Sequence, residues 1–199
     1  MYDFDAGDLS LNFANTQDWH ASKKPVENLK SFDDLINWGE QASLLSPELA
    51  RQLHQQAIEQ PVDATSSFDF AIQVREALYR IFSRRYLGEP VPEVDLALLN
   101  SVISQAMSHL QLAPSGSEFQ WEWSADINGA SRILWPVARS AAELLTSDVA
   151  SDVRMCEDDR GCGYLFIDQT KNHSRRWCSM ESCGNRAKAR RHYSKVQAS

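Results

Sequence analysis

The chain has 199 residues, of which 43% are hydrophobic and 24% are charged, a length that suits one domain of ordinary size or one domain with a small appendage. An apolar content near the globular average excludes a disordered polymer. The formal net charge of −7, taken over the whole chain, argues against a nucleic-acid binder.

The first 150 residues predict a mostly helical domain. Ser31 is a suitable N-cap, Ser46-Pro47 is a stronger start because proline is favoured at the first helical position, and Gly88 is a suitable stop. Apolar residues recur at helical spacing in each segment, which we interpret as core and not as a cofactor site. The four helices are expected over residues 31–45, 46–60, 67–87 and 93–110.

A helical pattern does not continue beyond residue 110. Residues 119–123 alternate bulky apolar with polar side chains, which predicts a half-buried strand, and residues 110–112 would be its hairpin partner. We expect Trp121 and Trp123 to cover the helical core. One more helix is expected over residues 133–145, and Pro136 should either begin it or kink it.

The last 49 residues differ from the rest in charge. Residues 1–150 carry 10 Lys+Arg and 21 Asp+Glu, a net charge of −11, whereas residues 151–199 carry 10 and 6, a net charge of +4. This asymmetry indicates a basic module that faces nucleic acid, attached to an acidic body; a merely solvated basic face is the alternative. The candidate nucleic-acid-binding residues are Lys171, Arg175, Arg176, Arg186, Lys188, Arg190, Arg191 and Lys195.

All four cysteines lie in the same basic segment, as Cys156, Cys162, Cys178 and Cys183. No secretory or membrane-spanning segment is evident, so we expect a cytoplasmic protein, in which thiols stay reduced and a metal site is favoured over disulfides. Two thiol pairs separated by 15 residues can surround one structural Zn²⁺ without an open catalytic position. A strand within residues 163–168 and a helix from about residue 180 would frame the ion.

Residues 175–193 read RRWCSMESCGNRAKARRHY, and this stretch resembles the CGNR zinc-finger family. In that family the finger follows a domain called ABATE, a stress-induced transcription regulator with a proposed ligand-binding role. The motifs LNFANT (residues 11–16), REALY (75–79) and LWPVARSAAELL (134–145) are similar to that domain. The resemblance implies that the four cysteines are the zinc ligands.

The sequence departs from the family pattern at two places. Five residues separate Cys156 from Cys162 where the family usually has four, and Gly161 is suited to absorb the extra residue in a bulge. Asn12 stands where the family usually has aspartate. The combined interpretation is a mainly α protein with a small β-hairpin: a helical ABATE-like domain over residues 1–149, and a four-cysteine zinc finger of hairpin and helix over residues 150–199.

The basic helix of the finger would present two stripes. Lys188, Arg191 and Lys195 share one face, and Arg186, Arg190 and Tyr193 share another, so that one face can contact phosphates while the other packs or probes bases. The alternative is that these arginines form ion pairs with the acidic body. A single finger offers few base contacts, so sequence specificity would require a homodimer.

Four residues of the first domain are candidates for a small-molecule site: Asn15, Thr16, Trp19 and Arg75. The competing interpretation, which we favour, is structural: Asn15 and Thr16 would have a capping or turn role, and Arg75 would form a surface ion pair. The leading functional hypothesis is a DNA-binding transcription regulator with a sensor domain. An RNA-binding or protein-interaction module is the second, with Tyr164, Phe166, Trp177 and Tyr193 stacking on bases. An enzyme is the third and weakest, because no catalytic motif is present.

Overall fold

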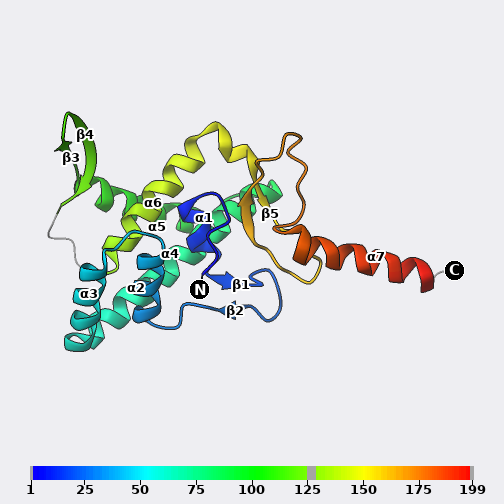
Figure 1. The fold of residues 1–199 in the computed structure, drawn as a ribbon, viewed down its shortest axis with the longest axis horizontal. Coiled ribbons are helices and arrows are strands. Elements are labelled where there is room, and N and C mark those ends of the chain that lie inside the picture. The colour runs from blue at the N-terminus through cyan, green and yellow to red at the C-terminus, as the bar shows by residue number, and fades with distance from the viewer. Residues whose placement is uncertain (1, 125–128, 198–199) are drawn as a thin grey trace.

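A computed structural model describes residues 2–124 and 129–197, without the side chains of residues 191, 192 and 194–197. Helices dominate, and short antiparallel strand pairs accompany them (Figure 1). The expected fold class is therefore confirmed. The elements of the first domain are α1 (Leu9–Ala14), β1 (Gln17–Asp18), β2 (Val26–Glu27), α2 (Phe32–Gln41), α3 (Pro47–Glu59), α4 (Pro61–Leu87), α5 (Glu93–Ser108), β3 (Leu110–Ser115), β4 (Glu118–Trp123) and α6 (Ser131–Thr146). The elements that follow are the 3-10 turn η1 (Asp148–Asp152), β5 (Val153–Met155), β6 (Leu165–Ile167), the π-helical turn η2 (Met180–Gly184) and α7 (Asn185–Gln197).

The predicted capping residues begin and end these helices as expected. The hydroxyl oxygens of Ser31 and Ser46 accept hydrogen bonds from first-turn amides, and Gly88 ends α4 at φ 69°, a left-handed conformation that glycine adopts without strain. Two boundaries differ from the prediction. Because Pro61 is itself well placed in a first helical turn, α4 begins there and not at residue 67, and α6 begins at Ser131 and continues through Pro136.

The core of the first domain lies around α4, which α1, α2, α3, α5 and α6 contact. Leu78 and Phe82 of α4 are buried there, together with Trp38 of α2 and Ile133 of α6. Each such side chain contributes about 1.5–3 kcal/mol by leaving water. Among the described residues, no helix has both the length and the apolar character needed to cross a membrane.

The β3–β4 hairpin projects from one end of the molecule (Figure 1). Leu112 pairs with Trp121, and Pro114 with Phe119, so these apolar side chains share one face of the hairpin. Trp123 lies near the core, its ring centroid 6.0 Å from that of Trp135. The prediction that Trp121 also covers the core is wrong, since it is 53% exposed. The alternation of apolar and polar residues predicted the apolar face of the hairpin correctly. The hairpin, however, points away from the helices that would bury this face.

The C-terminal segment packs directly on the helical domain. Strands β5 and β6 pair antiparallel, and Val153 and Leu165 are buried in the same core as the helices. The backbone N–H of Ile167 donates to the Ala6 carbonyl at 2.9 Å. Helix α7 instead leads away from the body, at the end opposite the β3–β4 hairpin (Figure 1).

Candidate metal centre and nucleic-acid interface

Four cysteine sulfurs converge where β5, η2 and the loops beside them meet. The Sγ atoms of Cys156, Cys162, Cys178 and Cys183 all lie within 4.8 Å of one another. Cys162 and Cys178 are 3.8 Å apart, and Cys178 and Cys183 are 3.7 Å apart. Tetrahedral Zn–S bonds of about 2.3 Å require S–S separations of about 3.8 Å. The cluster therefore fits one Zn²⁺ with four sulfur ligands.

Local backbone geometry brings these sulfurs together. The N–H of Cys156 donates to the Tyr164 carbonyl at 2.8 Å, which continues the β5–β6 pairing into the metal loop. Gly161 closes the five-residue turn between the first two cysteines at φ 89°, and its N–H donates to the Asp158 carbonyl. A Cβ on Gly161 would lie 2.6 Å from Ser22 Cα, so only glycine fits this turn against the first domain.

The second pair of cysteines is held by η2 and the start of α7. The Gly184 N–H donates to the Ser179 carbonyl and closes the turn that carries Cys183. Arg186, one turn further on, donates from Nη2 to Cys183 Sγ at 3.2 Å. This N–H···S contact supplies positive charge beside a sulfur that must be a thiolate to bind zinc.

Crowding of the thiols opposes the ionisation of Cys162 and Cys178 in the absence of a cation, while hydrogen bonds with these two lower the pKa of Cys156. Interactions with Cys156 and Cys162 raise the pKa of Cys178, and the interaction with Cys156 raises the pKa of Cys162 to about 12. A divalent ion reverses this balance, because a coordinated thiol is deprotonated. Zinc bound here would organise the finger and, with four sulfur ligands, would have no open position.

Residues 7–148 match the model of the ABATE family, whose description is "Putative stress-induced transcription regulator". The chain belongs to the ABATE family. Residues 153–195 match the CGNR zinc finger, so that the four clustered cysteines are a zinc-finger site for one Zn²⁺. No curated protein matches the chain. The expected resemblance and cofactor are both confirmed.

One acidic residue of the finger contacts several of the candidate nucleic-acid-binding residues. The Asp158 side chain is fully buried and faces Arg160 at 2.9 Å, Arg190 at 3.2 Å and Arg186 at 3.8 Å. Burial alone would raise its pKa, but the Arg160 and Arg190 contacts hold the pKa of Asp158 well below its usual range. Arg190 also pairs with Asp159. These contacts fix the start of α7 against the first metal loop.

Two further arginines serve the same loops. Arg176 pairs with Glu157 at 2.5 Å. Arg175 donates from Nε to the Trp177 carbonyl at 3.0 Å and from Nη2 to the Cys178 carbonyl, and its guanidinium lies 4.5 Å from the Phe166 ring centroid. Arg175 thus supports the backbone that carries a zinc ligand.

The interpretation that these arginines pair with the acidic first domain is therefore wrong for their ion pairs. Arg176, Arg186 and Arg190 pair with carboxylates of residues 157–159, inside the finger itself. The reason is proximity, since the turn between Cys156 and Cys162 carries three consecutive acids next to the basic helix. The Glu-Asp-Asp run at residues 157–159 is the feature of the sequence that indicates this neutralisation.

The remaining basic candidates are placed differently. Lys171 and Lys188 are exposed, and neither forms an ion pair within the part of the chain that the structure describes. The side chains of Arg191 and Lys195 lie outside the described residues. Lys171 also borders a shallow cavity of about 530 Å³ beside Met180, at the edge of the finger.

The four candidates for a small-molecule site do not come together. Asn15 and Thr16 line the same polar cavity, of about 550 Å³. Trp19 instead contacts the finger, with the guanidinium carbons of Arg160 and Arg186 at 4.8 Å and 5.3 Å from its ring. The competing interpretation fits in part: Asn15 caps α1, and Thr16 Oγ1 donates to the Phe13 carbonyl.

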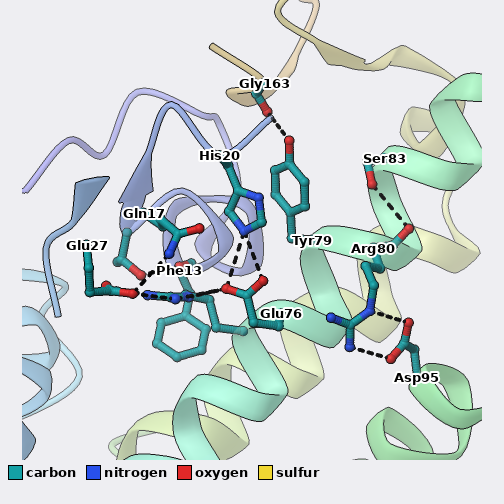
Figure 2. Close-up of polar contacts among 12 residues, drawn as sticks. Phe13, Gln17, His20, Glu27, Glu76, Tyr79, Arg80, Ser83, Asp95 and Gly163 are labelled. Atoms are coloured by element: carbon teal, nitrogen blue, oxygen red, sulfur yellow. Dashed lines mark hydrogen bonds and ion pairs between the residues drawn. The ribbon is translucent and has the colours of Figure 1, made fainter. Parts of the chain in front are cut away.

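Arg75 is in an ion pair, but not at the surface as expected. It is 1% exposed and binds both carboxylate oxygens of Glu27, at 2.6 Å and 2.7 Å, as well as Glu76. Figure 2 shows that Glu76 also reaches His20, which stacks on Tyr79. Burial opposes ionisation of Glu76, yet the contacts with His20 and Arg75 lower its pKa to about 2.

This network ends at the metal loop. The Tyr79 hydroxyl donates to the Gly163 carbonyl at 3.0 Å, one residue after Cys162 (Figure 2). Burial raises the pKa of Tyr79, which keeps the hydroxyl protonated as a donor. This contact could not be predicted from local sequence patterns, because 84 residues separate its partners.

Proposed function

We propose that the protein is a DNA-binding transcription regulator, in which the zinc finger contacts duplex DNA and the ABATE domain senses a small molecule. The observation that carries the proposal is the placement of α7: the zinc site and Asp158 anchor its start, and the helix leads away from the acidic body (Figure 1). A negatively charged body and a projecting basic helix restrict phosphate contacts to the finger.

The aromatic side chains favour duplex DNA over the RNA alternative. Phe166 is fully buried and so cannot receive an unpaired base, and Tyr164 is partly buried against the core. Tyr193 is 67% exposed and Trp177 is half-buried beside Arg176. Base stacking on single strands uses several accessible rings, and the described finger offers few.

A gel-shift assay of the zinc-loaded full chain against genomic fragments tests DNA binding. Neutralisation of about five phosphates would give a slope of log K against log salt of roughly −4 to −5. Lys188→Ala should reduce the magnitude of the slope by about 1, whereas Lys24→Ala, an exposed lysine of the first domain, should leave it unchanged. Absence of salt-dependent binding at low ionic strength would refute the proposal, and preference for single-stranded RNA in competition would favour the alternative.

We also propose that the protein is not an enzyme and acts in the cytoplasm as a homodimer. A zinc ion with four sulfur ligands has no site for substrate, and reduced thiols require a reducing compartment. Two copies would double the few base contacts of one finger. Sedimentation of the protein with and without DNA tests the dimer, which a monomer in both conditions would refute.

A further inference from the structure

The cavity that Asn15 and Thr16 line has a distinctive chemistry. It lies between the N-terminal segment, the end of α1 and α2, and its volume of about 550 Å³ is within the range of small-molecule sites. Five amide side chains, two carboxylates, a threonine hydroxyl and one tyrosine line it. Among the described residues that form its walls, none is Lys, Arg or His.

This lining selects against anions. Asp3 and Asp18 would repel a negatively charged ligand, and no basic side chain among the described wall residues would compensate. The same carboxylates attract a protonated amine. The amides supply both donors and acceptors, which match hydroxyl groups better than hydrocarbon. Asn12, only 8% exposed, has its Oδ1 engaged by the Ala6 N–H at 3.1 Å, so it offers its Nδ2–H groups to a ligand.

The cavity walls are bonded to the zinc finger. Asn15 Nδ2 donates to the Leu165 carbonyl at 2.7 Å, and its Oδ1 accepts from the Leu165 N–H at 2.9 Å. The Ala6 N–H donates to Asn12 Oδ1, and the Ala6 carbonyl accepts from the Ile167 N–H at 2.9 Å. One wall residue, Asn15, thus binds the backbone of β6 directly, and a second, Asn12, is connected to it through Ala6; β6 begins three residues after Cys162.

We propose that this cavity binds a small hydroxylated amine, positively charged at neutral pH, and that β6 transmits its occupancy to the metal site. A ligand that orders Asn12 and Asn15 stabilises the direct bonds of Asn15 to Leu165 and the Ala6 segment that bonds to Ile167, and therefore the loop that carries Cys162. Because coupling between sites is reciprocal, zinc binding strengthens ligand binding by the same factor. This inference rests on the proposed sensor role of the ABATE domain and specifies its ligand class and its route to the finger.

Three matched probes test the ligand class on the zinc-loaded full chain: glucosamine, neutral N-acetylglucosamine and anionic gluconate. In titration calorimetry we expect glucosamine to bind at millimolar concentration, N-acetylglucosamine to bind more weakly and gluconate not to bind. Asp18→Asn should weaken glucosamine binding roughly fivefold, whereas Asp69→Asn, the same charge change on an exposed part of α4, should not. Gluconate binding as tight as glucosamine, no binding of any probe, or an unchanged Asp18→Asn variant would each overturn the ligand class.

Zinc release to a chromogenic chelator tests the coupling. Glucosamine should slow release from the wild type, and gluconate should not. An unchanged release rate at saturating glucosamine would overturn the route through β6. A gel shift on the same samples separates the two proposals: loss of DNA binding refutes the proposed regulator, whereas intact DNA binding without glucosamine binding refutes only this inference.

Discussion

Replacement of Asn15 by alanine tests the bond between the two domains most directly. The side chain is 8% exposed, and both of its polar atoms bind the backbone of Leu165, which is fully buried. Truncation leaves a buried N–H and a buried carbonyl without partners, at about 1–3 kcal/mol each. We therefore expect Asn15→Ala to lower the free energy of unfolding by about 2–6 kcal/mol, a large part of the roughly 5–15 kcal/mol of a typical domain.

Urea unfolding of the zinc-loaded chain, followed by tryptophan fluorescence, measures this loss. Asn15→Asp should be as damaging as alanine, because a carboxylate would face the Leu165 carbonyl. Asn37→Ala is the matched control, since Asn37 lines the same cavity but is exposed, and it should change stability by no more than about 0.5 kcal/mol. A similarly small effect of Asn15→Ala would refute the reasoning that this side chain holds β6.

Four further predictions concern the metal site and the buried charges. Asp158→Asn should destabilise the chain by about 1–2 kcal/mol and speed hydrogen exchange at the start of α7, because it removes the buried carboxylate that the partly exposed Arg160 and Arg190 bind. Unchanged exchange would contradict this. Gly163→Ala should lower Tm, because the new Cβ would lie 2.4 Å from the Tyr79 hydroxyl and the backbone φ of 66° disfavours alanine. An unchanged Tm would show that Tyr79 moves aside without cost. Glu76 has its folded pKa lowered from 4.5 to about 2, so its contribution is complete above pH 4.5 and is lost as pH falls toward 2. The stability gap between wild type and Glu76→Gln should close over that interval, and a constant gap would be inconsistent with the shift. Cys178→Ser should abolish stoichiometric zinc in elemental analysis, and retention of a full equivalent would exclude Cys178 as a ligand.

Local sequence determined the elements that could be predicted. The helix ends at Ser31, Ser46 and Gly88 depend on hydrogen bonds to residues three or four positions away. Their effect can therefore be predicted from a short stretch of sequence. The metal site was predictable for a related reason. Cysteine pairs close in sequence are brought to one ion by short turns, and a reduced four-thiol cluster has few uses other than zinc.

Long-range polar contacts were not predictable in the same way. Asn15 and Leu165 are 150 residues apart, and Arg75 and Glu27 are 48 apart, with no periodic pattern that links them. Arg75 was expected at the surface because arginine usually is; its burial depends on a bidentate partner that only the fold supplies. Likewise, alternation along residues 119–123 gives the apolar face but not whether another element covers it.

The ion pairs of the arginines change how the charge difference between residues 1–150 and 151–199 should be interpreted. Counting eight basic residues against one acid over residues 171–195 predicts a strongly cationic surface, but the acids that matter lie upstream, at residues 157–159. A phosphate that recruited Arg190 would have to replace Asp158 and would then face the displaced carboxylate. The salt dependence of DNA binding should therefore follow the lysines that remain exposed, Lys171 and Lys188, more closely than the arginines. The arginines therefore stabilise the fold of the finger, and the acidic residues 157–159 limit the affinity of the finger for non-specific DNA.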